Sequence, residues 1–567
     1  MVRMAHSISE MTHHAAPGRA NDPDVRAREQ MLKKSRQRDI LFLSALVILC
    51  LILFFFLLGN RPLWDVDEGM HAATSKDMVL SGDWITPQFN GENFYDKPVL
   101  FNWLAAISFL IFGFTEFAAR LPAAMLGTGC VLVTYYLGKR MVSPTVGFLG
   151  GAILATSMEF IVLSRVVVHD IALTFFMTLA LTFFYLGYAD KSRQKSVWLP
   201  FYASLGLAVL SKGPIGVLLP GLIIVLFLLI KQRFNIIKDM QLGWGALVFA
   251  LIAAPWYGLI ILENEDYAGY FFIQQNLAYF FSGESRHPRP FYYYIPILVG
   301  GFFPWFLFLP AALFRSLRKG LGETNDGTLF LMLWFGAIFL FFSIASSKLS
   351  TYILPLFPAV SLLVAALWGD LWVLPAQEAP RKAILYPLAF FMATATAVLV
   401  YILIRPLDVL LVTYGIGPAR INILAFIMVA GTGLIFFLFL NRRYKTAFAA
   451  MNGMIVSVIL LFLVLIVPYI NPYRSTKGLA EKLDPLLSQG EKLTFFHRLQ
   501  DTTLFYTDRK ASILWGKQSI MDFLASDKRV FCVMEKKYFD VLKTDLPSAH
   551  VWAQEGDKLL ISNAKPL

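Results

Sequence analysis

Long apolar runs alternate with short polar connections along this chain, and that pattern predicts a helical membrane protein. A helix satisfies its own backbone hydrogen bonds inside lipid, and about twenty apolar residues cross a bilayer. About fourteen apolar runs approach that length. They lie near 40–60, 99–114, 121–138, 144–163, 171–188, 197–211, 213–230, 243–262, 293–314, 328–345, 352–374, 383–404, 420–440 and 446–469. Of the 567 residues, 57% are hydrophobic and only 16% are charged, so the expected fold class is an all-α, polytopic membrane protein.

The net charge of +12 arises from basic residues in the connections, which argues against nucleic-acid binding. Basic clusters occur at every second connection: Lys139-Arg140, Lys191/Arg193/Lys195, Lys231/Arg233/Lys238, Arg315/Arg318/Lys319, Arg381-Lys382 and Arg442-Arg443/Lys445. Short loops rich in Lys and Arg stay in the cytoplasm. We therefore expect all these connections, together with the basic tail 1–39, on the cytoplasmic side.

The basic tail 1–39 lies on the same side as the basic loops only if one apolar run between 60 and 139 does not cross the membrane. The run 99–114 is the shortest early one and contains Asn102 and Trp103. We interpret it as an interfacial helix in an outer loop that covers 61–120. About thirteen transmembrane helices then remain within 40–470, with the N-terminus cytoplasmic and the C-terminus outside.

Residues 471–567 have mixed charges and short strand-like runs, which predict a small α/β domain on the outer face. The expected strands are Leu493–His497, Arg529–Met534 and Lys558–Ser562, and a helix is expected near 535–544.

The first outer loop contains an acidic, aromatic-rich stretch, Trp64–Pro98, that follows the first apolar run directly. Asp67 and Glu68 lie near its start, where an ionised carboxylate can accept a proton or hold a cation. A solvated surface loop is the alternative interpretation of this stretch.

Asp170 and Lys97 are the next candidates. Asp170 ends SRVVVHD in a short apolar turn, where an acid is costly without a role or a partner, and Arg165 is the alternative partner. Lys97 stands in FYDKP, where a cation before a proline is well placed to hold a phosphate. The alternatives are that Lys97 pairs with Asp96 or extends to the interface.

Two aromatic and basic segments fall on the same predicted face. Arg286–Tyr294 (RHPRPFYYY) favours an anion pocket over a simple aromatic belt at the interface. Lys348 lies between two runs in SSKLSTYILP with Tyr352 one turn on, although a lone lysine there can also extend to the interface.

Three histidines, His71, His169 and His287, also reach this face, but their spacing is not a metal signature. Cations beside carboxylates at a membrane surface suit a lipid-linked phosphate substrate. A transporter would place charges at mid-bilayer, where these runs contain few.

Several of these motifs, taken in order, resemble the GT-C-fold glycosyltransferases of the protein-mannosyltransferase-like superfamily, and most closely the bacterial transferases that add aminoarabinose to lipid A. The resemblance runs from about 60 to 375. It includes the pair Asp67-Glu68, SGDWITPQFNGENFYDKP, LSRVVVHD, LSKGPIG, RHPRPFYYYIP and SSKLSTYIL.

The resemblance implies an inner-membrane enzyme that transfers a sugar, with inversion, from an undecaprenyl-phosphate-type carrier at the periplasmic face. The residues it implies as catalytic are Asp67, Asp170 and the neighbouring Glu68. Those implied around the carrier phosphate are Lys97, Lys348, Tyr352, His287 and Arg289. Those implied near the sugar or acceptor are His71, Phe94 and Tyr95. Asp96 and His287 match positions that in some members hold a divalent ion such as Zn, Mg or Mn, which is not required.

Three positions depart from the aminoarabinose transferases, which tend to have Tyr at His71, Tyr at Phe94 and Glu at Asp96. The donor sugar therefore stays open. The expected partners are a polyprenyl-phosphate sugar, lipid A or another envelope acceptor such as a protein or polysaccharide, and membrane lipids, with no nucleic acid and a monomeric chain. A flippase for lipid-linked sugars and a non-catalytic membrane scaffold are the alternatives from other classes.

Overall fold

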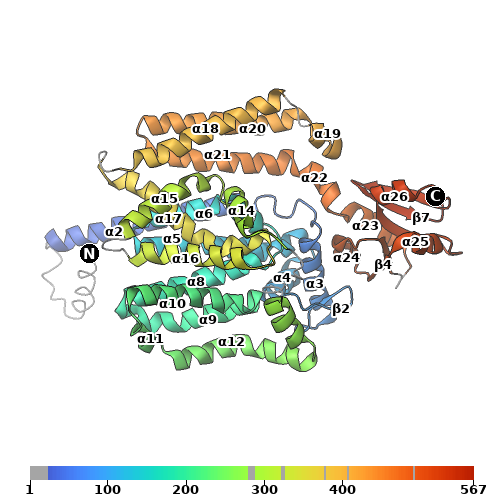
Figure 1. Ribbon diagram of the computed structural model, residues 1–567, viewed down its shortest axis with the longest axis horizontal. Helices are drawn as coiled ribbons and strands as arrows, with labels where there is room; N and C mark the ends of the chain where they lie inside the picture. Colours follow the sequence, from blue (N-terminus) through green and yellow to red (C-terminus); the bar gives the residue numbers. More distant parts are fainter. Residues whose placement is uncertain are drawn as a thin grey trace.

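The computed structural model describes residues 23–278, 288–320, 326–375, 379–404, 408–488 and 492–566. Most helices run side by side as a bundle, and a smaller domain sits beyond one end of it (Figure 1). The helices of the first half are α2 (Pro23–Cys50), η2 (Leu51–Phe55), α3 (Asp67–Ser81), α4 (Leu100–Phe112), α5 (Glu116–Met141), α6 (Pro144–Ala155), α7 (Met158–Leu163), α8 (Asp170–Ala189), η3 (Lys191–Arg193), α9 (Gln194–Lys212), α10 (Ile215–Lys231), α11 (Ile236–Asp239) and α12 (Leu242–Glu263).

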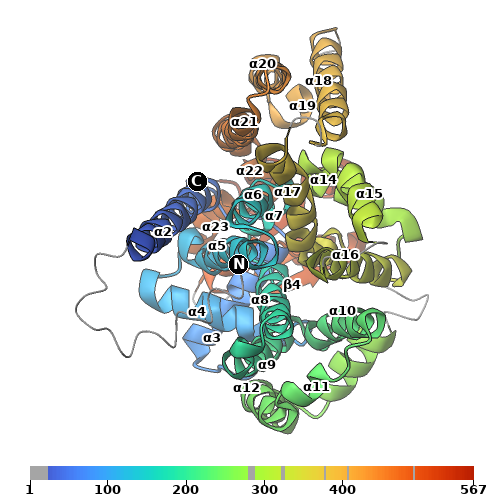
Figure 2. The ribbon, with the colours of Figure 1, turned by 90° about the vertical axis from the view of Figure 1, so that its left-hand side faces the viewer.

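The second half of the bundle ends in a layer of its own, because α18, α20 and α21 pack on one another beside the rest (Figure 2). The helices of this half are η4 (Gly269–Ala278), η5 (Phe291–Tyr293), α14 (Tyr294–Gly301), η6 (Trp305–Phe308), α15 (Leu309–Gly320), α16 (Asp326–Ile344), η7 (Ser350–Leu356), α17 (Phe357–Val373), α18 (Arg381–Ile404), α19 (Asp408–Tyr414), α20 (Pro418–Leu440) and α21 (Tyr444–Leu465).

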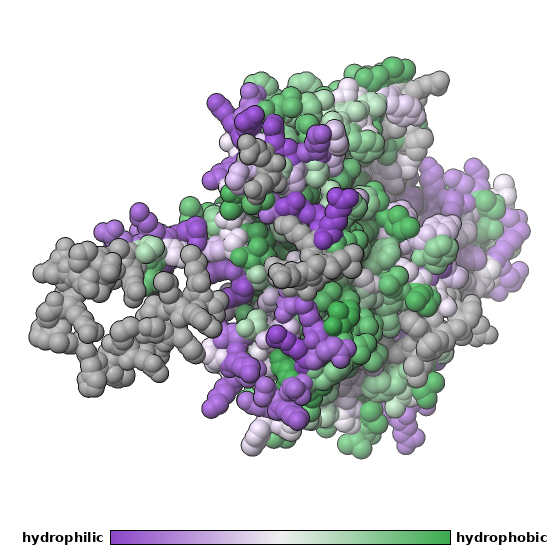
Figure 3. Space-filling view, turned by 60° about the vertical axis from the view of Figure 1, so that its left-hand side comes forward, coloured by the Kyte–Doolittle hydropathy of each residue, from purple (hydrophilic) through white to green (hydrophobic). Residues whose placement is uncertain are grey.

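The bundle has the surface of a multi-pass membrane protein. Among the described residues, nine helices are long and apolar enough to cross a membrane, or ten if one bent pair counts as a span. Figure 3 shows hydrophobic side chains between a polar surface at the end opposite the small domain and the polar small domain itself. The predicted all-α, polytopic class is confirmed, whereas the count of thirteen spans is not.

Two runs that the sequence suggested as continuous spans are broken. The run 144–163 is divided into α6 and α7 at Thr156-Ser157. The run 293–314 bends by 110° between Phe291–Gly301 and Trp305–Arg318. Hydropathy alone does not reveal these bends, because each apolar run continues across its break.

The interfacial helix predicted at 99–114 corresponds to α4. Its 13 residues rise about 20 Å, which is less than the roughly 30 Å of a hydrocarbon core. It packs against α3 and α5 at the end of the bundle that faces the small domain (Figure 1). Its length therefore supports the interfacial interpretation, which stays a prediction.

A short hairpin within 61–120 directs the chain toward Lys97. Strands β1 (Gln88–Phe89) and β2 (Glu92–Asn93) pair antiparallel across Asn90 and Gly91, whose φ angles are 56° and 78°. An Asn-Gly pair with two positive φ angles is the favoured two-residue hairpin turn. Asn90 also exchanges two hydrogen bonds with the backbone of Ala511, at 3.1 and 2.6 Å, which joins the hairpin to the small domain.

The C-terminal domain is built on a five-stranded sheet in the order β4-β3-β5-β7-β6, with β3 parallel to β4 and β5 and the other pairings antiparallel. Its elements, together with the helices that lead into it, are α22 (Val467–Arg474), α23 (Lys477–Leu483), η8 (Asp484–Leu486), β3 (Leu493–Phe496), α24 (Asp501–Thr507), β4 (Ala511–Leu514), α25 (Gly516–Leu524), β5 (Phe531–Glu535), α26 (Lys536–Leu542), β6 (His550–Glu555) and β7 (Lys558–Ser562). The predicted α/β class, the three predicted strands and the helix near 535–544 are confirmed, and β4 and β6 are additional. Hydrophobic side chains cover both faces of the sheet.

Helix α24 of this domain packs directly on α3. A Cβ atom added to Gly69 would lie 2.5 Å from the backbone nitrogen of Thr502, so only glycine permits this approach. The Asp65 carboxylate accepts hydrogen bonds from the Thr502 N–H at 2.7 Å and its hydroxyl at 3.0 Å. The Phe505 side chain joins the hydrophobic core of the bundle. The C-terminal domain thus holds the start of α3, where Asp67 and Glu68 lie.

Candidate active site

The ion pair between Asp170 and Lys212 defines the candidate site. Asp170 is the first residue of α8, and Lys212 is the last residue of α9, which ends at Gly213 with a φ of 83°. The two side chains contact each other directly, and each is only 11% exposed. Antiparallel neighbours α8 and α9 therefore bring an acid and a cation to the same end of the bundle, the end that carries α3 and α4 (Figure 1).

Lys212 was not among the residues singled out from the sequence, although its motif, LSKGPIG, was noted. A lysine that ends an apolar helix just before a glycine, on the face predicted for Asp170, was the available signal. Its ammonium also lies 4.4 Å from the centre of the Tyr352 ring, so η7 contributes to the same cluster.

The alternative partner for Asp170, Arg165, serves a different purpose. Its guanidinium donates to the carbonyl oxygens of Leu53 at 2.6 Å and Phe56 at 2.7 Å. Arg165 thereby caps the end of the first membrane helix, and the interpretation of an Asp170–Arg165 pair is wrong.

Lys97 joins the cluster from the segment between α3 and α4. Burial, followed by repulsion from Lys212, lowers the pKa of the Lys97 ammonium, while Asp96, Asp170 and Asp67 oppose that shift. The two lysines and these three acids therefore interact electrostatically at this end of the bundle. Asp67 itself is exposed at the first residue of α3, so it faces solvent rather than the packed core.

His71, one helical turn after Asp67, lies against His169. Their ring centres are 4.5 Å apart, and the Phe94 ring lies 6.0 Å from His71. Burial, together with the nearby Lys97 ammonium, lowers the pKa of His71 to about 3, so its ring is neutral at physiological pH. Its Nδ1 atom is buried without a hydrogen-bond partner among the described residues. His71 and Phe94 thus lie together, at two positions where the chain departs from the aminoarabinose transferases.

Asp96 and Tyr95 are oriented by the segment after α12. The Tyr270 hydroxyl donates to the Asp96 carboxylate. The Tyr95 hydroxyl donates to Asn264 Oδ1 at 2.8 Å, and its ring packs edge-on against Tyr267. Both side chains follow the β1–β2 hairpin, which sets the direction of this part of the loop.

Lys348, in contrast, is tied to backbone carbonyls. Its ammonium donates to Arg289 O at 3.1 Å and to Ala345 O, and only 3% of the residue is exposed. Pro288 forms an isolated β-bridge with Ser347 next to it. The Arg289 guanidinium lies 5.7 Å from the Tyr293 ring centre, and the residue is exposed. Lys348 therefore holds the segment that contains Arg289.

His287 lies outside the described residues. Among those described, no group of three or more His, Cys, Asp or Glu side chains is arranged to hold a metal ion. The divalent-ion site expected at Asp96 and His287 therefore stays a prediction.

Glu68 is the most heavily bonded acid of the site. It accepts from Arg61 at 2.9 and 3.2 Å, from Arg120 at 2.8 and 3.0 Å, and from the Trp64 N–H at 3.0 Å. Burial alone would raise the pKa of Glu68, but the two guanidinium groups outweigh it and hold the pKa at about 2. Its carboxylate thus fixes the start of α3 to α5 and to the end of the first membrane helix.

These features define the class of protein: a multi-pass membrane protein with acids and cations gathered at one end of its bundle, beneath a small α/β domain. The fold is also that of a solved structure, "ArnT from Cupriavidus metallidurans bound to Undecaprenyl phosphate". The match has a TM-score of 0.78 at 22% identity and covers 93% of this chain and 98% of that one.

Sequence comparison agrees. Residues 96–258 match the family described as "Dolichyl-phosphate-mannose-protein mannosyltransferase". The chain is 34% identical over 333 residues to an "Undecaprenyl phosphate-alpha-4-amino-4-deoxy-L-arabinose arabinosyl transferase" of Aeromonas salmonicida, and 33% identical over 310 residues to the protein with that name from Erwinia tasmaniensis. The matches cover 58% and 54% of this chain, and 60% and 55% of the length of those relatives. The resemblance to GT-C-fold glycosyltransferases, and to the aminoarabinose transferases among them, is confirmed.

Proposed function

We propose that this protein is an inverting glycosyltransferase that moves a sugar from an undecaprenyl-phosphate-type carrier to an acceptor at the periplasmic face, with lipid A as the acceptor. The observation that carries the proposal is the cluster of Asp170, Lys212 and Lys97 at the end of the bundle beside the C-terminal domain. Cations at a membrane surface suit the phosphate of a lipid-linked donor, whereas mid-bilayer charges would suit a transporter. The names of the relatives point to the same donor.

In this reaction an acceptor oxygen attacks C1 of the sugar, and the bond between C1 and the carrier phosphate breaks. Negative charge grows on the departing phosphate. Lys97 and Lys212 stabilise that charge, which is the kind of preorganised electrostatic contribution that dominates many enzymes. The Tyr352 ring lies against the Lys212 ammonium and helps to hold it beside the phosphate.

The acids have separate roles. Asp170 orients Lys212 through their buried contact. Asp67, exposed at the start of α3, accepts the proton of a hydroxyl acceptor. A lipid A phosphate is already an anion and needs no base, so Asp67 then orients the acceptor. Glu68, whose oxygens are held by Arg61 and Arg120, positions α3 rather than transferring a proton.

We infer that the protein is oriented with its basic loops in the cytoplasm and its C-terminal domain in the periplasm. The turns with Lys139, Lys191 and Arg442 lie at the end of the bundle opposite the C-terminal domain (Figure 1). The positive-inside rule assigns that end to the cytoplasm.

The test is transfer in nanodiscs, from a panel of defined undecaprenyl-phosphate sugars to lipid A, followed by mass spectrometry of both products. We expect sugar-modified lipid A and free undecaprenyl phosphate in equal amounts from one donor of the panel. Movement of intact donor across vesicles without bond cleavage would instead identify a transporter. Transfer to a protein or polysaccharide fraction but not to lipid A would show that lipid A is not the acceptor.

A further inference from the structure

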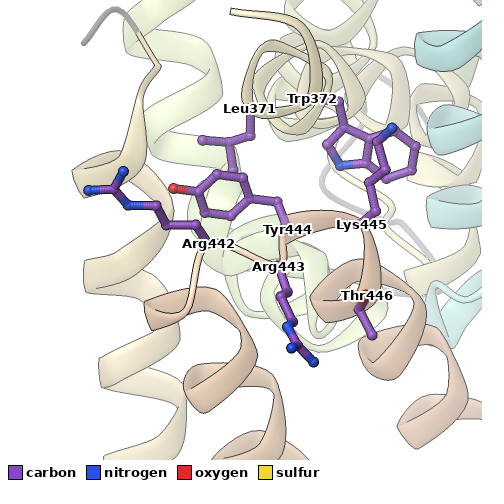
Figure 4. Close-up of a pocket in the computed structure, with 7 residues that line it drawn as sticks. All are labelled: Leu371, Trp372, Arg442, Arg443, Tyr444, Lys445 and Thr446. Carbon is purple, nitrogen blue, oxygen red and sulfur yellow. The ribbon is translucent and has the colours of Figure 1, made fainter. Parts of the chain in front are cut away.

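A second polar site lies at the opposite end of the bundle, far from Asp170. A cavity of about 280 Å³ opens there between the last turn of α17 and the connection from α20 to α21. Its lining is Leu371, Trp372, Arg442, Arg443, Tyr444, Lys445 and Thr446 (Figure 4).

The cavity has a concentrated positive charge. Three of its lining residues are cations, and none of the three forms an ion pair with a carboxylate among the residues that the structure describes. The nearest acid on α17, Asp370, is instead engaged by Arg315. The Lys445 ammonium lies 5.6 Å from the centre of the Trp372 ring, so it stays beside the cavity. An uncompensated cluster of this kind attracts an anion.

Two hydrogen-bond donors among the lining residues are buried without a partner within the described part of the chain. The hydroxyl of Tyr444 and the indole nitrogen of Trp372 are both inaccessible and unbonded within the described part of the chain. In Figure 4 the Tyr444 ring lies between Arg442 and Trp372. The Tyr444 hydroxyl points away from Trp372 in the same view, so one bound group does not serve both donors.

The neighbouring surface is apolar. Phe437 and Leu440, on the last turn of α20 before Arg442, are 62% and 49% exposed. In a membrane this surface contacts acyl chains directly below the cationic cavity. The combination of a cationic cavity and an apolar wall fits a lipid better than a free inorganic anion.

We propose that this cavity binds the phosphodiester headgroup of an anionic membrane lipid in the leaflet opposite the glycosyl-transfer site. Arg442 and Lys445, on opposite sides of the Tyr444 ring, attract the phosphate group. Arg443 adds charge at the rim. Basic pockets between membrane helices on the cytoplasmic side are a known way of holding anionic headgroups. Such a lipid ties the layer of α18, α20 and α21 to α17.

Binding of fluorescent phosphatidylglycerol to the full-length protein in mixed micelles tests the proposal, with phosphatidylcholine as the neutral probe. The variant Arg442→Gln/Arg443→Gln/Lys445→Gln removes the cavity charges. The variant Lys191→Gln/Arg193→Gln/Lys195→Gln removes three cations from the α8–α9 turn at the same end and is the matched control. We expect the cavity variant to bind phosphatidylglycerol at least about tenfold more weakly, and the control to stay within about twofold of the wild type.

A single variant separates binding from folding. Arg442 has a φ of 61°, a left-handed conformation in which glycine is unstrained. Arg442→Gly should therefore weaken binding without lowering the melting temperature. Equal losses of phosphatidylglycerol affinity in the cavity and control variants would mean that general surface charge attracts the lipid, and would overturn the proposal. Competition by millimolar inorganic phosphate as strong as that by phosphatidylglycerol would identify a soluble anion and overturn the lipid assignment.

Discussion

The Lys212 ammonium contacts the Asp170 carboxylate where α9 ends and α8 begins, and both side chains are largely buried. Such a pair is stabilising only while both partners are present, because removal of one leaves the other charge buried and unpaired. In the proposed reaction the same pair fixes the cation nearest Tyr352. The folding stability therefore depends on both charges being present, whereas transfer depends on the position of the Lys212 ammonium.

Lys212→Gln and Asp170→Asn should each lower transfer by about 10²-fold or more, because each removes or misplaces a charge beside the donor phosphate. Each should also lower the stability by about 3–5 kcal/mol, and the double variant should be more stable than the sum of the two losses predicts. Melting in detergent and transfer in nanodiscs measure the two effects. Additive losses in stability would mean that the two side chains do not interact.

Asp67→Asn and Glu68→Gln should differ, although the residues are adjacent. Asp67 is exposed, so its variant should lose less stability than Glu68→Gln and lose about 10²–10⁴-fold in transfer if the acceptor is a hydroxyl. A smaller loss fits a phosphate acceptor. Glu68→Gln leaves Arg61 and Arg120 without a charged partner, so it should lower the melting temperature. If instead Glu68→Gln is stable and inactive, Glu68 takes part in the chemistry.

Asp501 should make the stability of the C-terminal domain depend on pH. Burial, together with the nearby carboxylates of Asp65 and Asp67, raises the pKa of Asp501 to about 7 from its ordinary 3.8. A raised folded pKa means that the folded state binds the proton more tightly. This contribution to stability is therefore complete below about pH 4 and is lost as the pH rises through about 7.

Asp501→Asn removes this titration. Each pKa unit corresponds to about 1.4 kcal/mol, so the variant should be more stable than the wild type at pH 8, by up to about 4 kcal/mol. Its melting temperature should change less between pH 5 and pH 8 than that of the wild type. Parallel pH profiles of the two proteins would show that another group is responsible.

Cysteine labelling in intact cells tests the orientation. All three native cysteines are buried, so they provide a low background. Phe114 and Val142, at opposite ends of α5, are 39% and 49% exposed. We expect Phe114→Cys to react with an impermeant maleimide and Val142→Cys to react only after permeabilisation. The opposite result would reverse the proposed topology and place Asp67 and Asp170 in the cytoplasm.

Much of the fold could be predicted because the local hydropathy pattern indicates membrane helices and buried strands. Lys558–Ser562 is a fully buried strand, and its apolar pattern identified it. The number of spans was harder to predict, since α6 and α7 are separated by a break that leaves the apolar run intact. The Asn90-Gly91 turn has a clear local signal, but that signal lies in residue type and not in hydropathy.

The candidate site was only partly predictable, because it depends on contacts between distant segments. The importance of Asp170 followed from the cost of an acid in an apolar turn, but its partner did not, since Lys212 lies on the next helix. Glu68 illustrates the reverse case. From the sequence it was equivalent to Asp67, and only the positions of Arg61 and Arg120 distinguish the two acids.

The close approach of Gly69 to Thr502 also determines when during biosynthesis this protein can first act. The Thr502 N–H and hydroxyl that donate to Asp65 belong to a helix more than four hundred residues further along the chain, which is translated later. Until that segment has arrived and folded, the start of α3 lacks the surface against which it packs. A nascent chain with every membrane helix inserted would therefore still be inactive, and a stop codon within the final hundred residues should abolish transfer as completely as the loss of an acid in the site.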